Sequence, residues 1–243
     1  MTPRHPALLA TDLDGTLVGD PVALAMLNAE LAARRDRLAL VYVTGRSLPS
    51  TLALIETEGL LVPDVIVADV GSHVYDGPNW TIDVRWHQRM SRNWSPSRVR
   101  AVASFFPQLT RQPPDCQTAF KCSYYLDAAM APFVLPALDD ALRWHRVNAR
   151  VIYSSGRDLD FVPAGSGKGN AVRHVASRLG VPLADVVTCG DSGNDREMLA
   201  IGCPAAVVAN HQPELLPMPG AIYRARGAYA AGVQEALAHF GHL

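Results

Sequence analysis

The sequence lacks the patterns that would mark a zinc protein, a secreted protein or a membrane protein. Its four cysteines form no CxxC pair and no histidine cluster at zinc spacing, so we expect ordinary buried thiols. Only four apolar residues separate Pro6 from Thr11, far short of a signal-peptide core or a membrane span. Basic residues form no run and total 22 against 23 acidic residues. These absences argue against nucleic acid and anionic membranes as partners, and they favour the cytoplasm.

The composition describes a chain that can fold around a sizeable core. Of the 243 residues, 49% are hydrophobic and 19% are charged, and the formal net charge is −1. Such values are typical of soluble globular proteins and argue against long disordered stretches. The length allows one large domain, or a main domain with a smaller companion.

Five short apolar runs end at polar residues or glycine, as strands buried on both faces of a parallel sheet do. The runs are residues 7–10, 38–43, 65–68, 186–189 and 205–209. Helical periodicity separates them, for example over residues 171–179, where Gly180 supplies a stop. We therefore predict an α/β fold with a Rossmann-like parallel sheet and helices on both faces. Ligands of such sheets lie beyond the carboxyl ends of the strands.

The middle of the chain differs from the rest in its composition. It holds three of the four tryptophans, the Pro113-Pro114 pair and two β-prone stretches, residues 121–126 and 150–153. We predict that residues 83–164 form an inserted α+β cap domain that covers the crevice. Residues 1–82 and 165–243 then form the core domain.

Two carboxylates, Asp12 and Asp14, lie two residues apart where the first apolar run ends. An extended chain directs residues i and i+2 to the same side. One carboxylate can therefore attack a phosphorus atom while the other reaches the ester oxygen. Gly15 permits a sharp exit from the strand. An ordinary strand-end turn is the alternative interpretation of this motif.

A second polar group, Thr44 to Ser47, follows the second run. Its hydroxyl and its free backbone N–H groups near a helix start suit a phosphate dianion. The alternative is that Ser47 simply caps a helix.

Lys168 lies among glycines at the start of the helix predicted over residues 171–179. The full GxxxxGK[ST] motif is absent, which argues against a nucleoside triphosphate as ligand. A lysine here can deliver one positive charge to a single phosphoryl group. The alternative is an exposed lysine at a helix start.

Two more acids, Asp191 and Asp195, follow the fourth run. Together with Asp12 they form the kind of oxygen-rich cluster that a hard ion such as Mg²⁺ prefers. Capping of a helix by Ser192 and Asn194 with Asp195 is the alternative, but capping does not require Asp191 at the strand end.

The four groups follow one another as DxDGT, TGR, a lone lysine and GDSxND, and this order resembles the haloacid dehalogenase (HAD) superfamily. Residues 41–47, 121–127, 152–163 and 210–215 resemble the sucrose-phosphate phosphatase family more closely, and the likeness extends over nearly the whole chain. The resemblance implies a HAD-like hydrolase core and a mobile cap between the second and third motifs. It agrees with the changed composition of residues 83–164.

By this resemblance Asp12 forms an aspartyl-phosphate, while Asp14 protonates the leaving sugar oxygen and then deprotonates the attacking water. The resemblance also implies that Mg²⁺ is held by the carboxylates of Asp12 and Asp191 and by the backbone carbonyl of Asp14. Thr44 and Lys168 are the residues implied to hold the phosphoryl oxygens.

Two further implications concern the acids. Asp195 is implied to orient Lys168 or a metal-bound water. Transport ATPases of the superfamily have threonine at the position of Asp14, and the dehalogenases lack this acid/base. Its presence therefore favours a phosphatase or a phosphomutase.

The resemblance implies hydrolysis of sucrose 6-phosphate, a step of sucrose biosynthesis. Alternatives are another disaccharide or glycoside phosphate, such as mannosylfructose, glucosylglycerol or trehalose phosphate, and a phosphomutase reaction. A different class of function is a non-catalytic phosphosugar-binding partner of a sucrose-phosphate synthase. We expect an enzyme, because every acid and the lysine are present, and the synthase remains an expected partner.

We expect substrate contacts from both parts of the chain. The predicted substrate-binding residues are Gly45, Arg46, Asn194, Lys121, Arg157 and Asp158. Aromatic residues of the middle segment can stack on a sugar ring or can belong to the core. They are Trp86, Trp94, Trp144, Tyr124 and Tyr125.

Overall fold

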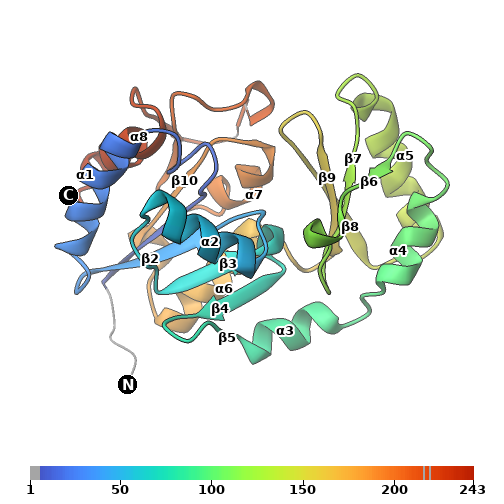
Figure 1. Ribbon diagram of the computed structural model, residues 1–243, viewed down its shortest axis with the longest axis horizontal. Helices are drawn as coiled ribbons and strands as arrows, with labels where there is room; N and C mark the ends of the chain where they lie inside the picture. The colour runs from blue at the N-terminus through green and yellow to red at the C-terminus, as the bar shows by residue number, and fades with distance from the viewer. Residues whose placement is uncertain (1–5, 216, 219) are drawn as a thin grey trace.

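The main sheet occupies one half of the computed structural model, which describes residues 6–215, 217–218 and 220–243 (Figure 1). Within these residues it has eight strands in the order β12-β11-β10-β1-β2-β3-β4-β5. In that order the strands are Tyr223–Arg224, Ala205–Val207, Val186–Gly190, Ala7–Thr11, Leu38–Val43, Val65–Ala68, His73–Asp76 and Thr81–Ile82. The α/β class and all five predicted strands are confirmed.

The central strands are parallel and the last two are not. Strands β12, β11, β10, β1, β2 and β3 pair in parallel, whereas β4 pairs antiparallel with β3 and β5 antiparallel with β4. Only the short 3-10 segment η1 (Asp69–Gly71) and Ser72 separate β3 from β4. A parallel return needs a crossover of a dozen residues or more, roughly, so this connection forces a hairpin.

Helices cover both faces of the main sheet because successive residues of each strand point to opposite sides. Leu9 and Leu40 pack on one side with α1 (Pro21–Ala32), α2 (Leu48–Glu58) and α8 (Tyr229–His239). Leu8 and Val41 pack on the other side, with α3 (Val84–Ser91), α6 (Lys168–Leu179) and α7 (Arg196–Leu199). Helix α6 ends at Gly180 in the left-handed conformation, as predicted.

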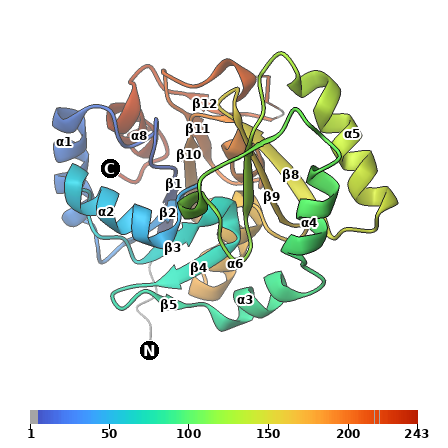
Figure 2. The same cartoon turned by 45° about the vertical axis from the view of Figure 1, so that its right-hand side comes forward.

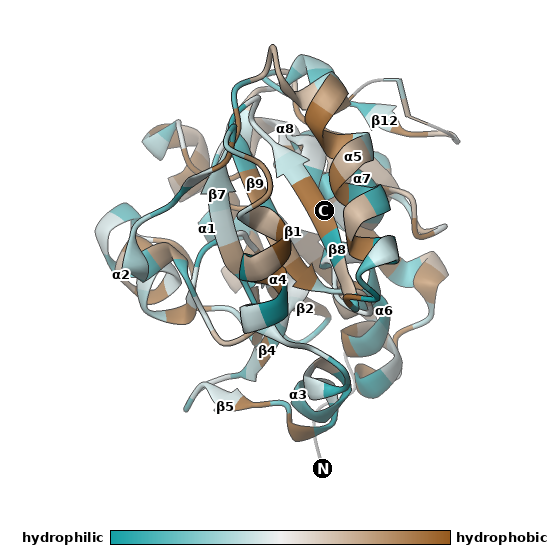
Figure 3. Cartoon of the chain, turned by 90° about the vertical axis from the view of Figure 1, so that its right-hand side faces the viewer, coloured by the Kyte–Doolittle hydropathy of each residue, from teal (hydrophilic) through white to brown (hydrophobic). Residues whose placement is uncertain are grey.

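A second, antiparallel sheet lies beside the first in the order β6-β7-β9-β8. Its strands are Thr110–Arg111, Cys122–Tyr125, Asp158–Pro163 and Ala149–Ser154. Helices α4 (Pro96–Ala103) and α5 (Ala131–Trp144) pack on the face that points away from the main sheet (Figures 1 and 2). Both carry polar and apolar residues, as helices with one buried side do (Figure 3). The other face of this sheet therefore looks toward the core.

Short 3-10 segments complete the connections. They are η2 (Pro114–Cys116), η3 (Leu183–Asp185), η4 (Gly193–Asp195) and η5 (Pro213–Leu215). None of the helices in the described ranges is both long and apolar enough to cross a bilayer. Cys122 and Cys189 are buried as expected, but Cys116 and Cys203 are only half-buried, because they lie in connections.

Candidate active site

Asp12 and Asp191 meet because the strands that carry them are neighbours. Strands β1 and β10 pair in parallel with Thr11 opposite Cys189, so both strands end at the same edge of the sheet. Asp12, Asp191 and Asp195 each present a carboxylate oxygen, and these oxygens lie within 4.8 Å of one another. All three side chains are buried. The sequence prediction that these acids gather at one point agrees with this geometry.

Lys168 lies between two of these acids. Its Nζ donates to Asp12 Oδ1 and to Asp195 Oδ1, each at 2.6 Å, and its side chain is fully buried. Burial acts to lower the pKa of Lys168, but Asp12 and Asp195 raise it overall, so the ammonium stays charged. Asp195 in turn accepts the backbone N–H groups of Asp191 and Ser192, each at 3.0 Å. Asp195 therefore makes both the contact with Lys168 that the resemblance implies and the contacts with the backbone before η4 that the capping alternative implies.

The acidic cluster carries more negative charge than Lys168 balances. Burial raises the pKa of Asp12 well above its usual value, Lys168 opposes this effect, and Asp195 and Asp191 add to it. Burial and then the charge of Asp195 raise the pKa of Asp191 to about 6. Three carboxyl groups that face one ammonium suit a divalent cation with oxygen ligands. These residues therefore fit a bound metal ion.

Close packing holds the cluster together. Thr16 Oγ1 donates to Asp191 Oδ1 at 2.9 Å. Gly15 has a φ of 80°, and a Cβ atom there would lie 2.5 Å from Asp191 Oδ2. Asn210 donates to the carbonyl of Gly15 at 2.7 Å. The exit from β1 thus needs glycine for its backbone conformation and for the space that Asp191 fills.

Asp14 and Arg46 form an ion pair with each other. Arg46 Nε and one terminal nitrogen donate to the two oxygens of Asp14 at 2.7 and 2.6 Å. A second terminal nitrogen of Arg46 donates to Ser50 at 3.0 Å. Half of the Asp14 side chain is exposed, in contrast to the buried Asp12. The structure thus joins a residue predicted for proton transfer to one predicted for substrate binding.

In the loop after β2, the hydroxyl of Thr44 is used within the loop itself, and the residues that follow it line the cleft. Thr44 is fully buried, and its Oγ1 accepts the backbone N–H of Arg46 at 3.1 Å. Ser47 is the first residue before α2, yet in the described part of the chain its side chain makes no capping hydrogen bond. The capping alternative for Ser47 is therefore not seen. Gly45, Arg46 and Ser47 line a cleft above the acids.

This cleft has a volume of about 590 Å³, within the roughly 300–1,000 Å³ typical of small-ligand sites. Asp12, Asp14 and Asp191 line one side of it, and residues of the second sheet line the other. Thr44 and Lys168 do not line it in the described chain, because they lie buried behind its wall. All six predicted substrate-binding residues line the cleft: Gly45, Arg46, Lys121, Arg157, Asp158 and Asn194.

Sequence reasoning missed part of the wall formed by the second sheet, including Gln112 and Asp160. In strand β9, Leu159 and Phe161 pack in the hydrophobic cluster while Asp158 and Asp160 line the cleft. Strand β7 pairs with β9 in register, with Ser123 opposite Asp160 and Tyr125 opposite Asp158. The period-two pattern of residues 121–126 and 158–161 was therefore the signal that marks the polar face. Gln112 Nε2 donates to Asp158 Oδ1 at 3.0 Å and follows the short strand β6.

The aromatic residues of the middle segment divide between core and cleft. Trp86 and Tyr124 are buried in hydrophobic clusters, and Trp94 packs against them. Trp144 is 83% exposed and lies outside the lining of the cleft described above. Tyr125 lines the cleft, and the guanidinium of Arg157 lies 5.0 Å from its ring centroid. Of the five aromatics, Tyr125 has the position needed for a sugar contact.

A model of the sucrose-6F-phosphate phosphohydrolase family matches residues 5–241. The probable sucrose-phosphatase 2 of Arabidopsis thaliana is 32% identical over an alignment of 250 residues, which covers 96% of this chain and 59% of the plant protein. The mannosylfructose-phosphate phosphatase of Agrobacterium fabrum is 32% identical over 240 residues, which cover 96% of each chain. The chain thus spans about three fifths of the length of the plant relatives it matches.

A solved structure agrees with these sequence matches. It is that of the sucrose-phosphatase from Synechocystis sp. PCC6803 in complex with sucrose and phosphate, which superposes with a TM-score of 0.92 at 36% identity. The superposition covers 97% of this chain and 98% of that one. The resemblance drawn from the motifs is confirmed: the chain belongs to the sucrose-6F-phosphate phosphohydrolase family.

Proposed function

We propose that this protein is a phosphatase that hydrolyses a phosphosugar, sucrose 6-phosphate, with Asp12 as the nucleophile. The observation that carries the proposal is that Asp12 lines a cleft whose opposite wall is polar and that Asp12 is contacted by the buried ammonium of Lys168. The likeness to a sucrose-phosphatase solved with sucrose and phosphate supports the choice of substrate.

In the first step an oxygen of Asp12 attacks phosphorus, and the bond between phosphorus and the sugar oxygen breaks. We assign protonation of that leaving oxygen to Asp14, which lines the same cleft. In the second step Asp14 takes a proton from water, the water oxygen attacks phosphorus, and the bond to Asp12 breaks to release phosphate. Lys168 stabilises the negative charge of the transferring group, because its ammonium already touches Asp12.

We propose Mg²⁺ as the cofactor, held by Asp12 and Asp191. When bound, it would neutralise negative charge on the phosphoryl oxygens. Asp195 keeps Lys168 and the backbone of Asp191 in place, since it contacts both.

We propose that within residues 83–164 the second sheet with α4 and α5 acts as a cap that selects the sugar, whereas α3, at the start of that segment, packs on the main sheet. The support is that Tyr125 of β7, Asp158 and Asp160 of β9 and Lys121, the residue before β7, line the cleft, while α4 and α5 cover the opposite face. Carboxylates and ammonium groups on one wall can pair with several sugar hydroxyls at once. Arg46 can exchange its ion pair with Asp14 for the phosphate of the substrate.

The substrate is tested by measuring released phosphate from a panel of esters. The panel contains sucrose 6-phosphate, mannosylfructose phosphate, glucosylglycerol phosphate, trehalose 6-phosphate and p-nitrophenyl phosphate. We expect the highest kcat/KM with sucrose 6-phosphate. A best substrate without a fructosyl unit would refute the sucrose assignment, and an isomerised phosphosugar without released phosphate would show a phosphomutase.

One rival has specific support. The mannosylfructose-phosphate phosphatase of Agrobacterium matches along 96% of its own length, much as the Synechocystis sucrose-phosphatase matches along 98%. The same panel decides between the two disaccharide phosphates.

The mechanism is tested by Asp12→Asn, which keeps the shape of the side chain but removes the nucleophilic carboxylate. We expect turnover to fall by about 10⁴-fold or more, the range seen when a catalytic nucleophile is removed. Unchanged phosphate release from the folded variant would refute covalent attack by Asp12.

We also propose a cytoplasmic location and association with a sucrose-phosphate synthase. Free thiols at Cys116, Cys122, Cys189 and Cys203 suit a reducing compartment. Co-purification of the tagged protein with the synthase of its own cell tests the association, and recovery of the protein alone would count against it.

A further inference from the structure

The connection between β3 and β4 touches the loop that follows β2. Asp69 N–H donates to the carbonyl of Arg46 at 2.9 Å, and Val70 N–H donates to the carbonyl of Thr44 at 3.0 Å. Asp69 and Val70 both have φ values near 54°, at 53° and 55°, a conformation that is rare for a residue other than glycine. The structure around them therefore forces this connection against the loop.

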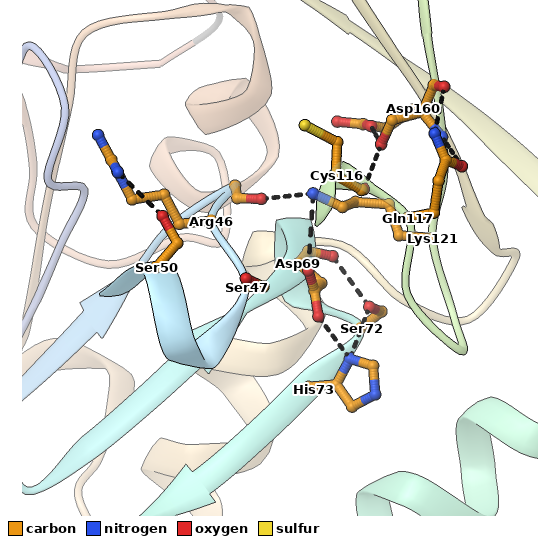
Figure 4. A network of polar contacts seen from close by, with 12 residues as sticks. Arg46, Ser47, Ser50, Asp69, Ser72, His73, Cys116, Gln117, Lys121 and Asp160 are labelled. Carbon is orange, nitrogen blue, oxygen red and sulfur yellow. Dashed lines mark hydrogen bonds and ion pairs between the residues drawn. The ribbon is translucent and has the colours of Figure 1, made fainter. Parts of the chain in front are cut away.

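The carbonyl between those two, that of Gly45, is held by the second sheet. Lys121 Nζ donates to it at 2.7 Å, and the Lys121 side chain is 7% exposed (Figure 4). The preceding residue, Phe120, packs its ring 5.0 Å from that of His73 and 4.9 Å from that of His87. Phe120 and Lys121 thus dock on the core at two adjacent points.

Asp69 faces this docking point with a buried carboxylate. Its Oδ2 lies 2.9 Å from His73 Nδ1, and its Oδ1 lies 3.6 Å from Lys121 Nζ (Figure 4). Among the described residues Oδ1 accepts no hydrogen bond, so Lys121 is the cation it faces. Ser72 Oγ donates to the Asp69 carbonyl at 2.9 Å and lies 3.3 Å from His73 Nδ1.

We propose that Asp69, oriented by His73, is a positioning residue that holds the ammonium of Lys121 against Gly45. Lys121 lines the cleft, so its placement couples the sugar wall to the loop that carries Arg46. Without the negative charge of Asp69, the Lys121 ammonium is held less strongly at the Gly45 carbonyl. It can then turn toward Asp160, which also lines the cleft. This inference rests on the proposed phosphosugar hydrolysis.

The test compares Asp69→Asn with the wild type on two substrates. Asparagine tolerates the positive φ of residue 69, so the backbone is preserved. For sucrose 6-phosphate we expect kcat/KM to fall about tenfold, mainly through KM, as for a lost interaction with a charged group. p-Nitrophenyl phosphate has no sugar that could contact the second sheet. For this ester we expect kcat/KM to change by less than about twofold, which is less than the loss of one interaction with a charged group would cause.

Lys121→Met and the double variant Asp69→Asn/Lys121→Met complete a double-mutant cycle with Asp69→Asn. We expect the double variant to be no worse than Lys121→Met, because Asp69 acts through that lysine. Equal losses on both substrates, or additive losses in the double variant, would overturn the proposal. Asp76→Asn is the matched control, since it removes a partly exposed carboxylate that pairs with Arg178 outside the cleft.

His73 supplies an independent arm if Asp69→Asn does not fold. His73→Phe keeps a ring against Phe120 but loses the contact with Asp69, so we expect the same selective loss on the sugar phosphate. His73→Asn restores a donor near Asp69 Oδ2 and should recover activity. If the wild type is active and His73→Phe has the same kcat/KM on both esters as the wild type, this inference alone is overturned. If the wild type hydrolyses neither ester, the proposed function is overturned.

Discussion

Lys168 is the residue on which the buried charges of the cleft floor depend. It is fully buried, and its two partners, Asp12 and Asp195, are buried as well. In such a triad the loss of one member leaves the others as uncompensated charges in a medium of low dielectric constant. The same side chain therefore contributes to the stability of the fold, and in the proposed mechanism it also takes part in the chemistry.

We predict that Lys168→Met abolishes phosphate release and lowers the free energy of unfolding by about 3–5 kcal/mol. Urea unfolding in the presence of a chelator measures the second effect. Arg143→Met is the control, because Arg143 and Asp140 form an exposed pair, and it should not change the midpoint measurably. A Lys168→Met protein as stable as the wild type would contradict the buried-triad interpretation.

The proposed binding of Mg²⁺ also depends on individual residues. If Asp12 and Asp191 hold Mg²⁺, the ion stabilises the folded state by mass action, by about 2.7 kcal/mol at one hundred times its Kd. We predict that Mg²⁺ raises the Tm of the wild type and not that of Asp191→Asn. Asp185→Asn, which removes an acid before the start of β10, should respond like the wild type. An equal shift in all three proteins would place the ion elsewhere.

Among the elements, η1 and the residue before α6 form a close junction. Gly71 has a φ of 87°, and a Cβ atom there would lie 2.3 Å from the backbone of Gly167. The residue after Gly167 is Lys168, so this contact sets how closely the β3–β4 connection approaches that lysine. Gly180, at the end of α6, has a similar φ of 72° but no atom within 4 Å of its Cβ position.

Substitutions at these two glycines distinguish the cost of backbone strain from the cost of overpacking. We predict that Gly180→Ala costs about 1–2 kcal/mol, the penalty of a left-handed alanine, and leaves kcat unchanged. Gly71→Ala carries the same penalty plus about 1–3 kcal/mol of overpacking, and it should lower kcat because the lysine loop must move. Chemical unfolding and steady-state assays compare them, and equal effects of both variants would show that the junction has room to spare.

The sequence predicted the elements unevenly, for physical reasons. Strands β2 and β3 agree with the predicted residues 38–43 and 65–68, because strands buried on both faces are unbroken apolar runs. Strand β4 was missed, because it is short, half-buried and turned back by η1. In the cleft, Asp12 and Asp191 were predictable from strand ends, whereas Asp160 depends on which face of β9 looks inward.

At the scale of the molecule, one buried carboxylate joins the start of α3 to α6. Asp83 Oδ1 accepts the N–H of Trp86, while Oδ2 contacts His174 and Arg178. Burial acts to raise the pKa of Asp83, but the N–H of Trp86 and then His174 lower it overall. Because the folded pKa lies below the unfolded one, this carboxylate stabilises the fold above the unfolded value, and the contribution disappears as the pH falls through the folded value.

We predict that Asp83→Asn is less stable than the wild type at pH 7, and that the difference fades below about pH 3.9, the ordinary pKa of aspartate. Asparagine still caps α3, so the variant isolates the charge from the cap. Unfolding midpoints measured from pH 7 to pH 3 report the effect. A difference that stays constant across that range would show that the charge of Asp83 does not link α3 to α6.

The sequence by itself determined the parallel core and the meeting of Asp12 with Asp191, because these follow from local apolar runs and from the residues at their ends. It also determined the family, through the resemblance of its motifs to those of known phosphatases. Only the tertiary structure decided that Asp14 pairs with Arg46, that Lys168 is buried between two acids, and that Lys121 reaches Gly45. Each of those contacts joins segments that are distant in the chain. The contact of Lys121 with Gly45 depends on how the second sheet packs against the core, and the other two contacts depend on how the loops after β1 and β2 and the start of α6 pack together. No local pattern of residues encodes either arrangement.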